Sequence, residues 1–213
     1  MNLLVLITGL GDAALLLPAS AGILLWLTCN RCWRAAAWWL VAFALCTGAI
    51  ALLKIYFGVC SANPDLRSPS GHACLSALVY GSLLGIAGMH IEARQRYCVA
   101  AAGAALLLGI GWSRVALGAH SVIETLIGMG IGLAGMAAFL AAYRNDAETP
   151  RPVAGLLLAA ILLGVLFHGQ ALHAEPLLHW AGSYLRSALG TGCVTAHGGA
   201  FFIGFEKAST AFY

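Results

Sequence analysis

The sequence predicts an all-α protein, a polytopic membrane bundle of about six transmembrane helices. Hydrophobic residues make up 61% of the chain, charged residues make up 9%, and the mean hydropathy is +0.89. A typical soluble domain has about 25% charged residues. The alternating ten-residue pattern of a membrane β-barrel is absent from the sequence. Backbone groups in lipid are otherwise satisfied only within helices, so the apolar runs are predicted to be helical.

Each predicted span is long enough for the membrane, because a helix of about 20 residues crosses roughly 30 Å of hydrocarbon. The spans are residues 12–28, 35–58, 71–91, 97–115, 119–143 and 153–172. Every second connection between them carries arginines: Arg31 and Arg34, Arg94 and Arg96, Arg144 and Arg151. Because excess Lys and Arg marks the cytoplasmic side, these connections are predicted to face inward. The other two connections and both termini then face outward.

The chain is predicted to form a single domain over residues 1–213, since no linker or soluble insertion interrupts the spans. Small residues at four-residue spacing, Gly81 with Gly85 and Gly128 with Gly132, predict close helix contacts. Residues 173–213 are expected to form a tail that includes an amphipathic helix in the outer interface. The net charge of +3 is too small to indicate a nucleic-acid partner, so the expected surroundings are a bilayer.

Two polar stretches interrupt the apolar pattern on the predicted outer face. They are RSPSGHACLS at 67–76 and WSRVALGAHSVIE at 112–124. Ionisable groups at membrane depth are costly and normally mark function. The candidates on this face are Lys54, Arg67, His72, Arg114, His120 and Glu124.

These residue types match the needs of phosphoryl transfer through a phosphohistidine. If the fifth span begins near Ala119, His120 and Glu124 lie at i and i+4 on its first turn. The carboxylate then accepts one imidazole N–H and makes the other ring nitrogen a better nucleophile.

A phosphate site is predicted at the start of the third span. Ser70 is a candidate N-cap, and free amides near Ser70 and Gly71 would face a docking anion. Lys54 and Arg114 would add positive charge, and His72 could protonate a leaving oxygen. Two histidines and a carboxylate also match zinc chemistry, but the converging cations argue against a metal. We therefore expect neither a metal nor another cofactor.

The two stretches also carry a resemblance to the type 2 phosphatidic acid phosphatase superfamily of integral-membrane lipid phosphatases. The second motif of that family, P-S-G-H, is present as Pro69 to His72. The third motif, S-R-x5-H-x3-D, is matched by Ser113, Arg114 and His120, with Glu124 in place of aspartate.

The first motif of the family, K-x6-R-P, is only partly present. Lys54 fits this motif, but Ser61 and Ala62 stand where arginine and proline are usual. This change removes one phosphate clamp, and Arg67 is the candidate replacement for the missing cation.

The resemblance implies that His120 attacks phosphorus, Glu124 orients it and His72 is the general acid. It further implies a phosphate cradle made by Lys54, Ser70, Gly71, Ser113 and Arg114. The substrate would be a lipid phosphomonoester or pyrophosphate, such as phosphatidic acid, phosphatidylglycerol phosphate, undecaprenyl pyrophosphate or lipid A 1-phosphate. The expected location is a bacterial inner membrane, with the site facing the periplasm. Two alternatives are a lipid phosphotransferase that uses the same histidine and a non-catalytic lipid-binding subunit.

Overall fold

The described part of the protein, residues 3–60, 68–146 and 153–167 of a computed structural model, is helical with no strand. Its helices are α1 (Leu3–Gly9), α2 (Ala13–Cys29), α3 (Trp33–Cys60), α4 (Gly71–Met89), α5 (Ala93–Ala116), α6 (Val122–Asp146) and α7 (Val153–Phe167). Five helical segments are long and apolar enough to cross a membrane, the first of them formed by α1 and α2 together, and α7 is a shorter apolar helix. The predicted polytopic helical bundle is therefore confirmed.

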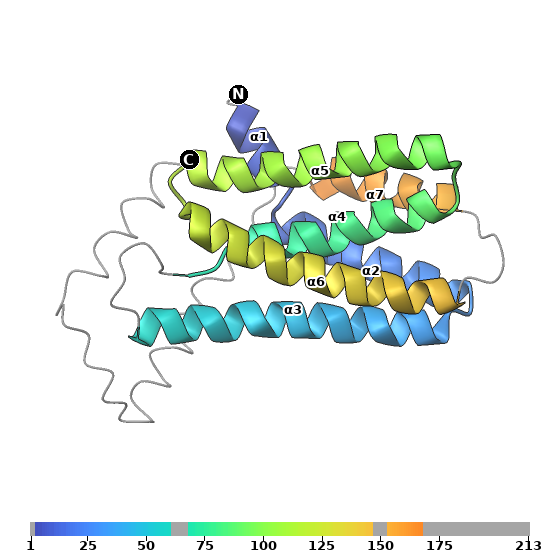
Figure 1. The fold of residues 1–213 in the computed structure, drawn as a ribbon, viewed down its shortest axis with the longest axis horizontal. Helices are drawn as coiled ribbons and strands as arrows, with labels where there is room; N and C mark the ends of the chain where they lie inside the picture. The colour runs from blue at the N-terminus through green and yellow to red at the C-terminus, as the bar shows by residue number, and fades with distance from the viewer. Residues whose placement is uncertain (1–2, 61–67, 147–152, 168–213) are drawn as a thin grey trace.

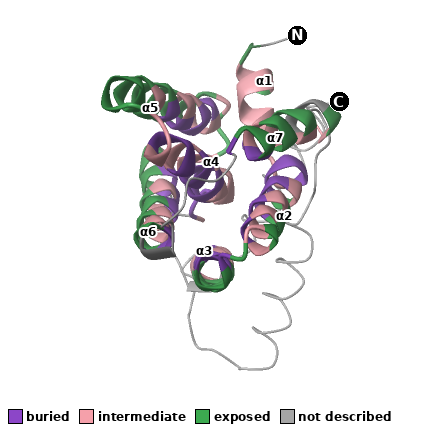
Figure 2. Cartoon of the chain, turned by 90° about the vertical axis from the view of Figure 1, so that its right-hand side faces the viewer, coloured by how far each residue is buried: buried purple, intermediate pink, exposed green. Residues whose placement is uncertain are grey.

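Helix α4 forms the centre of the bundle. It packs against α2, α3, α5 and α6, and it is the helix with the most continuous buried surface in the end-on view (Figure 2). The long helices lie side by side, so that α4 and α6 begin at the same end of the bundle at which α3 and α5 finish (Figure 1). The two polar stretches of the sequence are consequently brought to one end.

The predicted spans agree with the helices to within a few residues, with one difference that matters for the site. Helix α6, which corresponds to the fifth predicted span, begins at Val122 and not near Ala119. His120 therefore lies in the connection before the helix and not in its first turn. The predicted tail at 173–213 lies outside the described residues.

Close contact between α4 and α6 depends on glycine, as the sequence predicted. A Cβ on Gly81 or Gly85 would meet the side chains of Met136 and Leu140. At the other end, Gly128 and Gly132 pack against backbone carbonyls of α4 and its cap, so that a Cβ on either would collide with them. The first turns of α6 can therefore approach the first turns of α4 closely.

The carbonyl contacts allow a matched pair of substitutions on α6. Gly132→Ala places a methyl group against the carbonyl oxygen of Cys74, whereas a Cβ on Gly130 has nothing within 4 Å. We expect Gly132→Ala to destabilise the fold by about 1–3 kcal/mol through overpacking, and Gly130→Ala to be neutral or slightly stabilising. Thermal unfolding in detergent measures both, and equal melting temperatures for the two variants would contradict this packing.

Candidate active site

Glu124 and Ser121 form a reciprocal cap at the start of α6. The amide of Glu124 donates to Ser121 Oγ at 3.2 Å, and the amide of Ser121 donates to Glu124 Oε2 at 3.0 Å. This is a capping box, the S-x-x-E pattern that fixes a helix N-terminus. It explains why the helix begins after Ser121 and leaves His120 in the preceding connection. The predicted contact is still made, since His120 Nδ1 lies 3.1 Å from Glu124 Oε2.

The same carboxylate joins α6 to the segment that leads into α4. The amide of Ser68 donates to Glu124 Oε1 at 2.6 Å, and His120 Nδ1 lies 3.1 Å from the carbonyl oxygen of Ser68. In addition, the amide of Ser70 donates to the backbone carbonyl of Glu124 at 3.0 Å. The described part of the first polar stretch, 68–76, therefore meets the second, 112–124, through both backbone and side-chain bonds.

These partners determine the tautomer of His120. Both groups near Nδ1, a carbonyl oxygen and a carboxylate oxygen, can only accept a hydrogen bond. Nδ1 therefore carries the hydrogen in the neutral ring. The lone pair is left on Nε2, the nitrogen able to act as a nucleophile.

The end of α5 sets the distance between Arg114 and His120. Gly118 adopts a left-handed conformation with φ of 68°, the usual geometry for a residue that ends a helix. The chain then turns back, and the amides of Ala119 and His120 both donate to the carbonyl of Arg114, at 3.0 and 3.2 Å. The five residues between Arg114 and His120 thus form a turn that brings the backbone of His120 back to Arg114.

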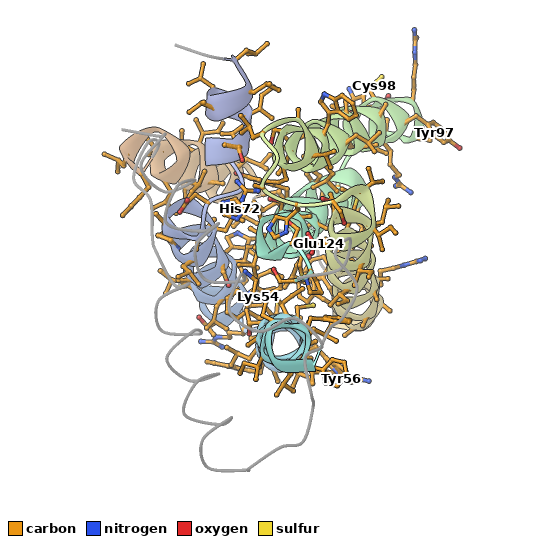
Figure 3. The ribbon with its side chains drawn as sticks, turned by 90° about the vertical axis from the view of Figure 1, so that its left-hand side faces the viewer. Lys54, Tyr56, His72, Tyr97, Cys98 and Glu124 are labelled. Atoms are coloured by element: carbon orange, nitrogen blue, oxygen red, sulfur yellow. The ribbon has the colours of Figure 1, made fainter. Side chains whose placement is uncertain are left out.

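Two cations make the surroundings of both histidines electropositive. Arg114 and Lys54 lie close enough to His72 and to His120 to act on both rings electrostatically. Lys54 projects from α3 toward the centre of the bundle, near His72 and Glu124, whereas Tyr56 on the same helix points away (Figure 3). Burial, followed by Arg114 and Lys54, lowers the pKa of His120, and Glu124 partly offsets this effect.

The start of α4 has the features expected of an anion site. Ser70 is the N-cap, as predicted, and its side chain accepts from the amide of Ala73 at 3.3 Å. The amides of Gly71 and His72, in the first turn, have no acceptor within the helix. Among the described residues, a Cβ on Gly71 would touch only Ile50, at 3.7 Å, so none of their side chains crowds the backbone there.

Ser113 and Arg67 are the other two predicted phosphate ligands. Ser113 is fully buried, and its hydroxyl donates to the carbonyl of Ile110 at 2.7 Å, so it is already engaged within its own helix. Arg67 lies outside the described residues, as do Ser61 and Ala62.

Sequence reasoning missed contributions from the N-terminal segment. Asp12 Oδ2 lies 3.7 Å from His72 Nε2, and Arg114 Nη1 donates to Thr8 Oγ1 at 3.0 Å. The available signal was a carboxylate at the outer end of the first span, on the predicted face of the site. Ser121 was also missed, although the S-x-x-E spacing is visible in the sequence.

No group of three or more His, Cys, Asp or Glu side chains within the described ranges is arranged to hold a metal ion. His72 is paired with Asp12 and His120 with Glu124. The donor atoms that the zinc alternative requires are therefore divided between two pairs.

Comparisons with known proteins match this part of the chain. A family model described as the PAP2 superfamily matches residues 54–148. A Klebsiella pneumoniae protein described as an uncharacterized 22.5 kDa protein in cps region is 30% identical over 151 residues, covering 69% of this chain and 71% of that protein. No solved structure matches the chain. The family match begins at Lys54 and contains both histidines, Arg114 and Glu124.

The surroundings of His120 predict how its titration responds to Glu124. Burial, Arg114 and Lys54 hold the pKa of His120 below its usual value of 6.5, and Glu124 opposes them. Glu124→Gln removes the negative charge that favours the imidazolium, so it should lower the pKa further. NMR titration of ¹⁵N-labelled histidine in detergent measures this, with the signal assigned by its loss in His120→Gln. Glu92→Gln, at the far end of the bundle, is the matched control and should leave the pKa unchanged. A higher pKa in Glu124→Gln would contradict the geometry.

Proposed function

The chain belongs to the PAP2 superfamily, and on this premise we propose that it is a membrane lipid phosphatase that works through a phosphohistidine on His120. Membership of the family supports a phosphatase-type function. The observation that carries the proposed mechanism is the hold on Nδ1 of His120 by Glu124 and the carbonyl of Ser68. It leaves Nε2 as the nucleophile, on a ring that Arg114 and Lys54 influence electrostatically.

In the first step, the phosphate of the substrate docks against the amides at the start of α4, near Arg114 and Lys54. The lone pair of His120 Nε2 attacks phosphorus, and the bond between phosphorus and the leaving oxygen breaks. That oxygen takes the electron pair and a proton from His72, and it departs as a lipid alcohol, or as a lipid phosphate when the substrate is a pyrophosphate. Glu124 balances the positive charge that develops on the phosphorylated ring.

In the second step, water replaces the leaving group. His72, now neutral, accepts a proton from the water as its oxygen attacks phosphorus. The bond between phosphorus and Nε2 breaks, and its electrons return to the ring. Inorganic phosphate leaves, so the sum is one ester or anhydride bond hydrolysed by one water.

The capping box gives a physical reason for glutamate where the family usually has aspartate. The box requires a side chain at the third helical position that reaches back to the amide of the cap residue, a role filled by glutamate or glutamine. Glu124 makes this contact and still reaches His120 and the amide of Ser68. We infer that the longer side chain combines helix capping with orientation of the nucleophile.

Apolar side chains beside the site support a lipid substrate. Trp112, Val122, Ile123 and Leu126 are 66%, 54%, 53% and 62% exposed, and they flank Arg114, His120 and Glu124 in the sequence. Tryptophan is enriched at membrane interfaces. A lipid whose head group binds beside His120 would therefore keep its acyl chains in contact with apolar surface. The four lipid phosphates named above remain the candidate substrates.

The direct test is phosphate release from a panel of lipid phosphates by purified protein in EDTA. We expect activity on at least one lipid and inhibition by vanadate. His120→Ala should reduce activity below detection, and His72→Ala should reduce it about 10²–10⁴-fold. Label recovered in an added lipid alcohol in preference to water would favour the phosphotransferase. An unchanged rate in His120→Ala would overturn the proposal in favour of a non-catalytic lipid-binding subunit, and a requirement for zinc would overturn the metal-free mechanism.

We further propose that the site opens to the periplasm from a bacterial inner membrane. Arg31 lies between α2 and α3, Arg94 and Arg96 lie in the first turns of α5, and Arg144 lies in the last turn of α6. These positions are at the end of the bundle opposite the site (Figure 1). The excess of cations at that end supports a cytoplasmic location for it.

Cysteine labelling tests the orientation. Ala119 is exposed beside the site, and Gln95 is exposed at the opposite end. In otherwise cysteine-free protein, a membrane-impermeant maleimide should label Ala119→Cys in intact spheroplasts and Gln95→Cys only after permeabilisation. The reverse pattern would place the site in the cytoplasm.

A further inference from the structure

The segment of residues 8–12, which joins the last turn of α1 to the start of α2, is fixed against the site end of α4 and α5. Tyr80 on α4 donates its hydroxyl hydrogen to the carbonyl of Leu10 at 2.7 Å. Gly11 fits so closely that a Cβ would lie 2.9 Å from Ile110 and 3.1 Å from Ser76 Oγ. The same Cβ would lie 3.4 Å from the Cβ of His72. The segment is therefore held beside His72 by packing and by a hydrogen bond.

Asp12 uses its two carboxylate oxygens for different purposes. Oδ1 accepts from the amide of Ala14 at 2.8 Å and caps α2. Oδ2 lies 3.7 Å from His72 Nε2, and the Asp12 and His72 side chains are 16% and 28% exposed. This distance is within ion-pair range but too long for a hydrogen bond. The carboxylate therefore favours a positive ring.

His72 is surrounded by charges of both signs, and these charges affect whether it can act as an acid. In the described part of the chain, the charged groups that act on the ring are Asp12 from the start of α2, Arg114 from α5 and Lys54 from α3. Burial and then the two cations disfavour a protonated imidazole, and a general acid must be protonated before it can donate. Asp12 is the group of opposite sign in this set. The cations that bind phosphate would otherwise disable the acid beside them.

We propose that Asp12 is a positioning residue that holds the His72 ring and offsets the positive charge of Arg114 and Lys54 around it, so that the segment of residues 8–12 is part of the active site. This inference rests on the proposed function. It extends the site beyond residues 54–148, the segment that the family model matches. Thr8 belongs to the same arrangement, because it accepts a hydrogen bond from Arg114 at 3.0 Å.

Asp12→Asn separates the charge from the cap, because asparagine is as good an N-cap as aspartate. The experiment measures kcat against pH for an alkyl lipid phosphate and for p-nitrophenyl phosphate, whose leaving group needs little help from an acid. We expect kcat for the alkyl substrate to fall about tenfold or more. The alkaline limb of its pH profile should move to lower pH, since the ring loses its negative neighbour. The aryl substrate should lose much less, and Asp12→Glu should recover part of the alkyl activity.

Glu92→Gln is the matched control, because it removes the same charge from another helix N-cap, at the far end of the bundle. It should behave as wild type. An Asp12→Asn variant with an unmoved alkaline limb, or with equal losses on both substrates, would overturn the inference while leaving the proposed function intact. Wild-type protein without phosphatase activity, or an active His120→Ala variant, would instead overturn the proposed function.

Discussion

The site depends on the carboxylate of Glu124, which is buried and therefore needs partners. The residue is 4% exposed, and an unpaired charge at that depth would be strongly destabilising. Its oxygens accept from the amides of Ser68 and Ser121 and lie in contact with the His120 ring. One side chain thus starts α6, fixes the segment before α4 and orients a histidine. The arrangement of His120 therefore follows from the need to satisfy a buried charge.

Helix packing brings those partners within reach. Gly128 and Gly132 let α6 approach the backbone at the start of α4, and Gly118 turns the chain back at the end of α5. In lipid, such contacts replace the hydrophobic driving force that is absent between helices. Glycine spacing thus allows two helix ends to approach closely, and Arg114 and Lys54 act electrostatically on the two histidines that lie there.

Most of the fold and the meeting of the two polar stretches could be predicted from the sequence. The length of the apolar runs determined the spans, and the alternation of arginines placed 67–76 and 112–124 at one end. The start of α6 was misplaced because the capping box of Ser121 and Glu124 went unnoticed. Asp12 and Thr8 were missed for a different reason. Their proposed role depends on how the segment of residues 8–12 packs against Tyr80, Ser76 and Ile110. No local sequence pattern predicts that long-range contact.

In the proposed mechanism, the imidazole of His120, oriented by Glu124 and the carbonyl of Ser68, becomes covalently phosphorylated. The most direct measurement is mass spectrometry of peptides from enzyme quenched in alkali during turnover, because phosphohistidine survives alkali. We expect an added phosphoryl group on the peptide that contains His120, and we expect this group to disappear when the substrate is exhausted. Efficient turnover with no label on His120, or label on His72 instead, would contradict it.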